Sequence, residues 1–334
     1  MNHLSGAVKY SFPKQRIVII GDLVADQFLH GTIARVSREA PVFILRHDET
    51  NTCAGAAANA AVNVASLGGK PVLIGARGLD TNGDLLLETL RESGVNCDFI
   101  LSDSALRTTT KIRVLAGHHY AARQQVIRID YENNTQISLS LQQKLLNNIE
   151  KAGKTADAII ISDYNYGVAS HQVFELARKL AKLRSIPLLI DSRFRLTDFP
   201  EATTATPNQD EVEQLIGKNF TAEQCSELRG KLGYESLLVT CGNQGMLLVQ
   251  KNEVPRRIEV VGSAKPVDVT GAGDTVIAVY SLGLASGLSF IDAAEVANHA
   301  GGIVVMKKGT ASVNPHELIE SLQATTKGVT ESFA

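Results

Sequence analysis

Residues 158–190 read AIIISDYNYGVASHQVFELARKLAKLRSIPLLI, and this stretch indicates the fold class. Its two ends, 158–161 and 187–190, are short apolar runs rich in Ile and Leu, which are typical of strands buried on both faces of a sheet. Between them, 171–184 carries apolar residues at three- and four-residue spacing, so it predicts a helix. A strand, a helix and a second strand in this order form the repeating unit of a parallel sheet.

The same alternation continues in both directions from this stretch. Short apolar runs and amphipathic segments follow one another along much of the chain of 334 residues. The pattern predicts an α/β fold with a three-layer α/β/α core, in which helices cover both faces of a mostly parallel sheet. Further strands are expected at 17–20, 71–74 and 236–239, and further helices at 56–67, 84–93, 139–151 and 211–216.

Two stretches, 32–47 and 107–132, break the alternation. In the second, segments such as 111–114 (KIRV) alternate polar and apolar residues with a period of two, and no helical segment intervenes. We therefore predict antiparallel strands that form a small β-sheet lid, which covers the ligand edge of the core and makes a homodimer by pairing with a second copy. The two insertions belong to one folding unit with the core, which is expected at 14–31, 48–106 and 133–334.

The charge and the cysteine content limit the kinds of partner. Lys and Arg total 33 against 35 Asp and Glu, so the formal net charge of −2 gives no broad field that would attract nucleic acid or an anionic membrane. The four cysteines show neither C-x-x-C spacing nor a zinc-finger pattern, which favours free thiols in a reducing compartment. No run approaches the roughly 18 apolar residues of a membrane span. We expect a cytoplasmic protein that binds a small molecule.

A glycine-rich turn at 268–274 (DVTGAGD) precedes an apolar helical segment, with Thr270 as the expected N-cap. Two glycines at a helix start each cost roughly 1 kcal/mol against Ala, and they leave bare N–H groups that an anion can approach. Asp274 beside this turn is placed to act as a general base, which takes a hydroxyl proton while the amides hold a phosphoryl group. The alternative is a first-turn acid that only interacts with the helix dipole, worth roughly 0.3 to 1 kcal/mol.

Other phosphate-binding motifs do not fit the chain. The pattern G-x-x-x-x-G-K-[ST] is absent, and Val276 stands where a dinucleotide fingerprint needs a third glycine after Gly271 and Gly273. This disfavours a nicotinamide-dependent dehydrogenase but leaves it open as an alternative.

The DVTGAGD turn resembles the C-terminal signature of the PfkB, or ribokinase-like, carbohydrate kinases. Other segments resemble further motifs of this family and follow in the family's order, from about residue 16 to about residue 316. The resemblance implies a ribokinase-like fold and the ATP-dependent transfer of a phosphoryl group to a sugar or sugar phosphate, with Mg²⁺ and a monovalent cation such as K⁺. The segments are GDLVAD at 21–26, GAAAN at 55–59, GARGLDTNG at 75–83, TPNQDE at 206–211 and TCGNQG at 240–245.

The resemblance also implies roles for single residues at the reacting end of the site. Asp274 would be the base, and Asp268 would help to seat the monovalent cation. The anion hole would consist of Gly271, Ala272 and Gly273.

The nucleotide and the sugar would lie on either side of this turn. Asn208 and Glu211 match the N-x-x-E pattern that, in the family, positions Mg²⁺ and phosphate through water. The remaining implied residues are Thr240, Gly242, Gly245 and Asn298 for ATP, and Asp26, Gly55 and Asn59 for the sugar hydroxyls.

Within the family, the chain resembles the kinase domain of ADP-heptose synthase, which phosphorylates heptose 7-phosphate at its anomeric hydroxyl. The supporting segments include 35–42 (RVSREAPV), 108–113 (TTTKIR) and 125–130 (QVIRID), whereas 191–194 reads DSRF in place of a DPKG turn. A phosphorylated acceptor needs cations, and each candidate on or near the lid has a solvated strand charge as its alternative reading. These candidates are Arg38, Lys111, Arg113 and Arg128.

Other functions stay open at this point. They are a kinase of this family for another sugar or a nucleoside, a non-catalytic sugar or nucleotide sensor on the same fold, and the dehydrogenase. A sensor should have lost the base or the metal-associated acid, yet Asp274 and Glu211 are both present. Because the sequence ends at Ala334, we expect a kinase without the nucleotidyltransferase domain that is often fused behind it.

Overall fold

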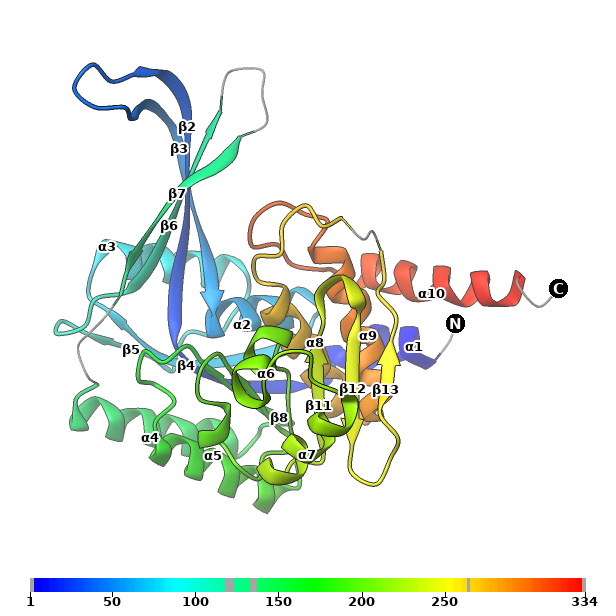
Figure 1. Cartoon of the computed structure of the whole chain (residues 1–334). Coiled ribbons are helices and arrows are strands. Elements are labelled where there is room, and N and C mark those ends of the chain that lie inside the picture. Colours follow the sequence, from blue (N-terminus) through cyan, green and yellow to red (C-terminus); the bar gives the residue numbers. More distant parts are fainter. Residues whose placement is uncertain (1–2, 118–122, 133–136, 263–264, 332–334) are drawn as a thin grey trace.

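A computed structural model of the chain describes residues 3–117, 123–132, 137–262 and 265–331. Within these residues the main sheet has nine strands, in the order β13-β12-β11-β10-β9-β8-β1-β4-β5 (Figure 1). All neighbours from β11 to β5 are parallel, and β12 and β13 run antiparallel at one edge. The predicted α/β fold with a mostly parallel sheet is confirmed. The strands are β1 Arg16–Gly21, β4 Lys70–Gly78, β5 Ile100–Asp103, β8 Ala158–Asp163, β9 Leu188–Ser192, β10 Thr204–Ala205, β11 Ser236–Thr240, β12 Met246–Gln250 and β13 Arg256–Ile258.

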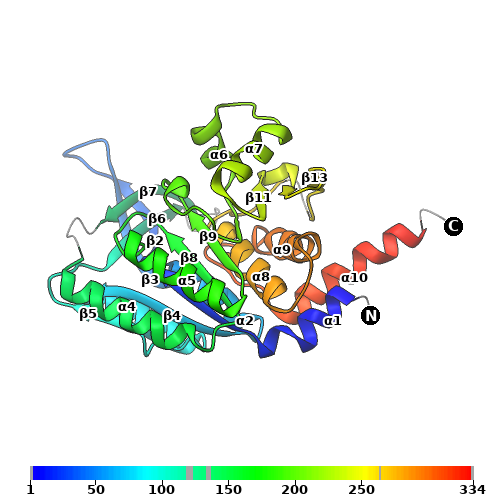
Figure 2. The ribbon, with the colours of Figure 1, turned by 90° about the horizontal axis from the view of Figure 1, so that it is seen from below.

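Helices cover both faces of this sheet because its strands are apolar on both faces. In β1, Ile17 and Ile19 share an apolar cluster with α2, α8 and α9, whereas Val18 and Ile20 share another with α4, α5 and α7. The terminal helices α1 and α10 pack side by side next to the first cluster (Figure 2). The helices are α1 His3–Tyr10, α2 Ala57–Ser66, α3 Thr81–Glu92, α4 Leu139–Gly153, α5 His171–Arg184, α6 Gln209–Ile216, α7 Ala222–Leu232, α8 Ala272–Ala285, α9 Phe290–Val304 and α10 Pro315–Glu331.

None of the helices that the structure describes combines the length and the apolar character needed to cross a membrane.

A separate four-stranded sheet, in the order β3-β2-β6-β7, projects from the core (Figure 1). Its strands are β2 Leu23–Val36, β3 Phe43–Ala56, β6 Thr109–Gly117 and β7 Gln124–Tyr131. We call these four strands the lid sheet. The hairpins β2–β3 and β6–β7 are antiparallel, but β2 and β6 pair in parallel. The parallel pair, which the sequence did not predict, follows from the long crossover through α2, β4, α3 and β5 that separates the two hairpins.

The first hairpin of the lid sheet is longer than the predicted range 32–47. It begins at Leu23 and ends at Ala56, so each strand reaches nine residues further toward the core. The inner half of β2 is largely buried, whereas β3 is buried only at its inner end, from Ala54 to Ala56. Burial of β2 on both faces removes the alternation of polar and apolar residues that marks a strand with one exposed face. Parts of the predicted lid and core, 118–122, 133–136, 263–264 and 332–334, lie outside the described residues. The division into core and lid remains a proposal.

Two carboxyl groups, buried Asp22 and half-buried Asp80, fix the loops that carry the site. Asp22, directly after β1, accepts three backbone N–H groups from the loop 164–168, at 2.9, 3.0 and 3.1 Å. Asp80, the N-cap of α3, accepts the N–H groups of Gly83 and Thr108, both at 2.8 Å. The first contact shapes the loop after β8, and the second anchors the start of β6 to the core.

Candidate active site

The glycine-rich turn opens α8 in a way that differs from the prediction. Gly271, with a φ of 78°, is the N-cap, and α8 begins at Ala272. The predicted N-cap Thr270 is wrong: its backbone N–H donates to Asp268 Oδ1 at 2.9 Å. The left-handed backbone at Gly271, which Gly adopts without a steric penalty, turns the chain into the helix one residue later than expected. The other oxygen of Asp268 accepts the N–H of Gly309 at 3.0 Å, so this carboxylate holds the turn in place.

Asp274 lies buried in the first turn of α8, and each of its oxygens has a partner from a different element. Asn59 Nδ2 on α2 donates to Oδ2 at 2.7 Å, and the Tyr164 hydroxyl after β8 donates to Oδ1 at 3.0 Å. Burial raises the pKa of Asp274 to about 6, against the lowering effect of these two hydrogen bonds. A carboxyl group with this pKa is ionised near neutral pH and accepts a proton more readily than an exposed aspartate.

A chain of side-chain hydrogen bonds fixes the orientation of the Asn59 amide. Asn63 Nδ2 donates to Asn59 Oδ1 at 3.1 Å, and the Thr275 hydroxyl donates to Asn63 Oδ1 at 3.0 Å. With its oxygen occupied, the Asn59 amide presents its N–H group to Asp274. The sequence had assigned Asn59 to the sugar, and the structure adds this contact with the predicted base.

Asp26 and Gly55 face each other across β2 and β3. A Cβ atom at Gly55 would lie 2.8 Å from Asp26 Oδ2, so a larger residue would displace this carboxylate. Arg113 on β6 donates to Asp26 Oδ1 at 2.6 Å. Because the charge of Asp26 also acts on Asp274 to raise its pKa, the structure brings these predicted sugar ligands to the same site as the predicted base.

The four predicted lid cations lie in different places. Lys111 and Arg113 lie in the inner, buried part of the lid sheet, whereas Arg128 is exposed and bonds Asp130 at 2.9 and 3.0 Å. Arg38 is exposed in the turn between β2 and β3. From Asp26 to the outer end of β2 is ten residues, or about 33 Å along an extended strand. Arg38 therefore lies far from Lys111 and Arg113, at the other end of the hairpin.

Of the residues predicted to bind ATP, all except Asn208 line one cavity of about 190 Å³, which Ala272 and Gly273 of α8 also line. Asn298 is buried there and donates to the Glu259 carbonyl at 2.7 Å. Gly245 has a φ of 79°, and a Cβ atom would lie 2.0 Å from the Ile258 carbonyl oxygen, so this turn requires glycine. The other predicted members in the lining are Thr240 and Gly242.

Asn208 and Glu211 form a capping box at the start of α6. Glu211 N–H donates to Asn208 Oδ1, while the backbone N–H and side-chain amide of Asn208 donate to the two Glu211 oxygens, all at 2.8 to 2.9 Å. Burial raises the pKa of Glu211. Across the described residues, no group of three or more His, Cys, Asp or Glu could hold a metal ion.

Three residues at the carboxyl ends of the parallel strands were not recognised as site residues from the sequence. Tyr164 follows β8 and bonds Asp274, and Arg193 follows β9. Burial, and then the carboxyl groups of Asp274 and Glu211, raise the pKa of Asp191 well above its usual range, which places Asp191 beside both. Tyr164 and Arg193 directly follow parallel strands, and Asp191 lies near the end of β9. These positions were the available signal, because ligands bind at that edge of such sheets.

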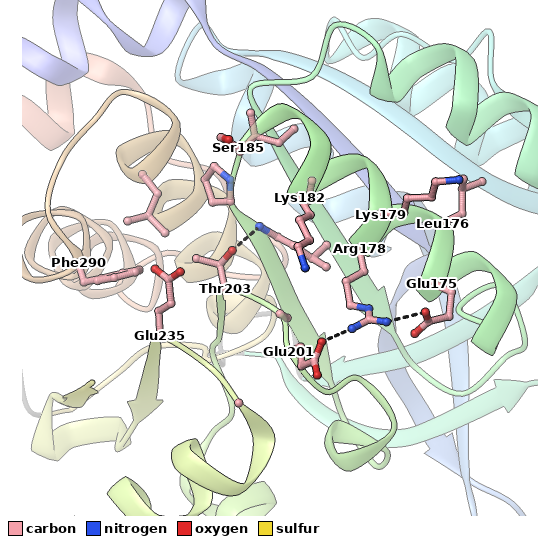
Figure 3. Close-up of a pocket in the computed structure, with 17 residues that line it drawn as sticks. Glu175, Leu176, Arg178, Lys179, Lys182, Ser185, Glu201, Thr203, Glu235 and Phe290 are labelled. Atoms are coloured by element: carbon pink, nitrogen blue, oxygen red, sulfur yellow. Dashed lines mark hydrogen bonds and ion pairs between the residues drawn. The ribbon is translucent and has the colours of Figure 1, made fainter. Parts of the chain in front are cut away.

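A larger cavity of about 1080 Å³ lies at the opposite edge of the sheet (Figure 3). Leu188, Thr203 and Glu235 line it at the amino ends of β9, β10 and β11, and Arg178 bonds Glu175 and Glu201 beside it. None of the predicted site residues lines this cavity. Although this cavity is larger than the one lined by Asn298, its lining gives no support for placing the active site there.

Residues 14–317 match the model of the pfkB family carbohydrate kinases, which defines the protein as a phosphotransferase that acts on a sugar hydroxyl. The chain belongs to this family. The match confirms the resemblance seen in the sequence and makes the dehydrogenase alternative wrong.

Curated relatives carry the name Bifunctional protein HldE. The one from Proteus mirabilis is 37% identical over 321 residues, which cover 93% of this chain and 65% of the relative. The one from Histophilus somni is 38% identical over 325 residues, 94% of this chain and 65% of the relative. The chain thus spans a little less than two thirds of the length of these relatives.

Solved structures share the fold at low identity. Escherichia coli phosphofructokinase-2 in complex with potassium matches with a TM-score of 0.75 and 17% identity, over 93% of this chain and 99% of that one. Arabidopsis thaliana ribokinase complexed with ribose and ATP matches with a TM-score of 0.69 and 20% identity, over 92% and 98%. The ribokinase-like fold is therefore confirmed.

Proposed function

We propose that this protein transfers the γ-phosphoryl group of ATP to a hydroxyl of a sugar or sugar phosphate, with heptose 7-phosphate as the first acceptor to test. The observation that carries the proposal is the buried Asp274, held by Asn59 and Tyr164 in the first turn of α8. A carboxylate with a pKa of about 6 next to exposed helix-start amides suits the removal of a hydroxyl proton during phosphoryl transfer.

In the proposed reaction, ATP lies in the cavity lined by Thr240, Gly245 and Asn298, and its γ-phosphate reaches the N–H groups at Gly271 and Gly273. The sugar lies near Asp26 and Gly55, with its reacting hydroxyl within reach of Asp274. Asp274 takes the proton as the hydroxyl oxygen attacks phosphorus in line with the leaving ADP. The helix-start amides hold the charge on the transferring group.

The proposed cation roles belong to two carboxyl groups, those of Glu211 and Asp268. Glu211 would hold Mg²⁺ through water, and bound Mg²⁺ neutralises charge on the phosphates. Burial acts to raise the pKa of Asp268, but the N–H groups of Thr270 and Gly309 outweigh it and lower that pKa. Asp268 therefore stays ionised, as a ligand of a monovalent cation under the turn must.

Support for a heptose acceptor comes from the relatives named Bifunctional protein HldE, together with the sequence resemblance to ADP-heptose synthase kinase domains. The test is ADP release from ATP with a panel of sugars and their phosphates. We expect kcat/KM to be highest for heptose 7-phosphate, with heptose and fructose 6-phosphate as matched comparisons. Absence of ADP release with every sugar, while ATP·Mg binds, would favour a sensor.

The pH dependence of kcat/KM follows from Asp274. Since the carboxylate must be unprotonated to accept the hydroxyl proton, kcat/KM should drop about tenfold per pH unit below about pH 6 and level off above it. Tyr164→Phe removes a hydrogen bond that lowers the pKa of Asp274, so the midpoint should move to higher pH. The measurement is a pH–rate profile from pH 4.5 to about 9, with Tyr10→Phe, at an exposed residue that ends α1, as the control. An unmoved midpoint in Tyr164→Phe would count against this assignment of the base.

We also propose a homodimer through the lid sheet. Its edge strand β7 exposes apolar side chains, with Ile127 at 53% and Ile129 at 41%. Ile127→Glu should give the mass of one chain, 35.8 kDa, by light scattering, where the wild type gives twice that mass. Leu183→Glu, at a residue 71% exposed on α5, is the control and should stay dimeric. A monomeric wild type at micromolar concentration would contradict the proposal.

A further inference from the structure

Asp22 is a buried residue directly after β1 that binds both elements that support the proposed base. Its side chain is 1% exposed and accepts three backbone N–H groups of the loop after β8. Its backbone carbonyl accepts the N–H of Ala57, the first residue of α2, at 3.2 Å. The loop carries Tyr164 and α2 carries Asn59, which are the two hydrogen-bond partners of Asp274. One residue of the core therefore holds both elements that orient the base.

The loop after β8 folds around the carboxyl group of Asp22. Every second residue from 164 to 168 donates its N–H group to this side chain, at 2.9, 3.0 and 3.1 Å. The residues between them, Asn165 and Gly167, have φ values of 64° and 103°. Backbone that contains such left-handed residues forms concave arrays of N–H groups that bind acidic oxygens. A left-handed asparagine is strained and persists where its surroundings hold it, so the shape of the loop depends on Asp22.

Tyr164, the first residue of this loop, connects Asp22 to the base. Its backbone N–H donates to Asp22 Oδ2 at 2.9 Å, and its hydroxyl donates to Asp274 Oδ1 at 3.0 Å. The direction of a side chain follows its backbone, because the allowed rotamers depend on φ and ψ. A loop of another shape would therefore withdraw the hydroxyl from Asp274, and the carboxylate would lose a hydrogen bond that stabilises its charge.

We propose that Asp22 is a positioning residue for Asp274: its carboxyl group shapes the loop after β8 and so keeps the Tyr164 hydroxyl hydrogen-bonded to the base. The proposal rests on the proposed function and deepens it, because it assigns to the reaction a residue that acts through another. The segment GDLVAD at 21–26 then has two separate tasks. Asp26 lies on the lid sheet opposite Gly55, whereas Asp22 supports the base from the core.

Other charged groups act on Asp274 from the lid sheet and from β9. Beyond burial and its two hydrogen bonds, Asp26 on β2 raises the pKa of Asp274 and Lys111 on β6 lowers it. Burial, and then Asp274, raise the pKa of Asp191 on β9. A replacement at Asp22 leaves these three groups in the chain, so their effects are common to the wild type and the variant.

The remaining elements packed against α8 carry ionisable groups with contacts of their own. Asp163, at the end of β8, pairs with Arg195. On α9, Asp292 bonds α1, His299 bonds α10, and Glu295 lies one helical turn from Asp292. The helix α2 carries no ionisable side chain. These groups also stay the same when Asp22 is replaced.

Asp22→Asn tests the proposal, because an amide cannot accept all three N–H groups. Oδ2 of Asp22 accepts two of them and Oδ1 accepts the third, so the NH₂ group of asparagine meets at least one N–H donor in either orientation. The loop must then relax and the Tyr164 hydroxyl must leave Asp274. We expect the titration midpoint of Asp274 to rise by about one pH unit, as for the loss of a hydrogen bond to a charged group.

The direction of the shift separates this effect from a change of charge. A nearby negative charge raises the pKa of a carboxyl group, so the loss of the Asp22 charge by itself would lower the midpoint of Asp274. In a Tyr164→Phe background, Asp22→Asn should raise the midpoint no further, because both replacements remove the same hydrogen bond.

The midpoint is measured without turnover, by carbon-13 NMR of protein labelled at the aspartate carboxyl carbon. The signal of Asp274 is the one that is absent in Asp274→Asn, and its midpoint in the wild type is expected at about pH 6. The pH profile of kcat/KM with the best acceptor should show the same shifts.

Two control variants separate positioning from stability and from the lid sheet. Asp157 accepts the backbone N–H of Arg16 at 2.8 Å, at the opposite edge of the main sheet. Asp157→Asn should lower the melting temperature and leave the midpoint of Asp274 unchanged. The Tyr166 hydroxyl donates to Glu132 Oε1, directly after β7, at 3.0 Å. Tyr166→Phe removes this contact between the same loop and the lid sheet, and it should also leave the midpoint unchanged.

Gly167→Ala changes the loop while it keeps Asp22. The φ of 103° is one that side chains rarely adopt, and the new Cβ atom would lie 3.6 Å from Ile137, an ordinary contact, so the strain falls on the backbone. The midpoint should rise as in Asp22→Asn. This variant decides the question if Asp22→Asn does not fold.

The proposal is overturned if folded Asp22→Asn keeps or lowers the midpoint of Asp274, or raises it further in the Tyr164→Phe background. An unchanged midpoint in Gly167→Ala overturns it where Asp22→Asn is unfolded. Cooperative melting shows that a variant is folded. Should the wild type phosphorylate no sugar, the proposed function fails, but the carbon-13 titration still decides whether Asp22 positions Asp274.

Discussion

Asp274→Asn is expected to lower kcat by about 10²- to 10⁴-fold and to leave the fold and ATP binding intact. An amide cannot accept the hydroxyl proton, so the base is removed, while the size of the side chain is kept. The oxygen of the new amide can still accept from Asn59 Nδ2, and the Tyr164 hydroxyl can turn to accept from its NH₂ group, as each partner bonds one oxygen of the native carboxylate. The measurements are kcat with the best acceptor and the change in melting temperature with ATP·Mg.

Stability gives a second readout for the same variant. Burial raises the pKa of Asp274 to about 6 in the folded protein, so folding favours the protonated acid. The stability from this proton is complete below the unfolded pKa near 3.8 and is lost as the pH rises through about 6. At pH 8 the ionised carboxylate of the wild type therefore lowers the stability of the folded protein, and the neutral amide of Asp274→Asn removes this loss. The melting temperature of Asp274→Asn at pH 8 should be equal to that of the wild type or higher.

Asp292→Asn, another first-turn acid, at the start of α9, is the matched control and should keep full turnover. Unchanged turnover in Asp274→Asn would remove this residue from the mechanism. A melting temperature well below that of the wild type would instead assign Asp274 a mainly structural role.

Gly271→Ala should reduce both stability and turnover. Its φ of 78° costs an L residue about 1 to 2 kcal/mol, and a Cβ atom would lie 2.5 Å from Asn59 Nδ2, the atom that holds Asp274. The melting temperature should fall by several degrees. Because the Asn59 amide must move, kcat should fall by about 10²-fold or more, as expected for a displaced catalytic group.

Gly273→Ala, two residues further on, separates stability from phosphate binding. A Cβ atom there has no neighbour within 4 Å, and alanine in a helix gains up to about 1 kcal/mol over glycine. We expect an unchanged or higher melting temperature together with a higher KM for ATP, because the new methyl group meets only the bound phosphate. Full activity in Gly273→Ala would show that phosphate does not approach the backbone at this residue, and full activity in Gly271→Ala would contradict the close packing against Asn59.

Much of the core could be predicted because its signals are local. The run 158–161 lies in β8 and the predicted helix 171–184 coincides with α5, since period and flanking residues are set within a few positions. The same local reasoning failed at Thr270, where the left-handed backbone of Gly271 moves the start of the helix. It also missed the inner halves of β2 and β3, since the burial of β2 and of the inner end of β3 depends on elements far away in the sequence.

The site shows a similar division. Asp274, Gly271 and Gly273 were found from one turn, because helix-start glycines beside an acid are visible in seven letters. Tyr164, Asp191 and Arg193 were not predicted as site residues, since the contact of Tyr164 with Asp274 and the effect of Asp274 on Asp191 arise only in the folded chain. Arg38 was grouped with Lys111 by its charge and by the resemblance, but it lies at the far end of the hairpin.

The sequence by itself determined the alternation of strands and helices along much of the chain and the glycine turn, and it predicted Asp274 as the reacting carboxyl group, because periodicity and backbone freedom are properties of short segments. Only the tertiary structure decided how that carboxyl group behaves and which cations remain unpaired. Asn59 and Asp274 stand 215 residues apart and meet at 2.7 Å. Within the described residues Lys111 has no ion pair, because Arg113 and Arg128 take the carboxylates beside it. Desolvation and charge pairing depend on which groups share a volume, and the fold brings those groups together from distant parts of the chain.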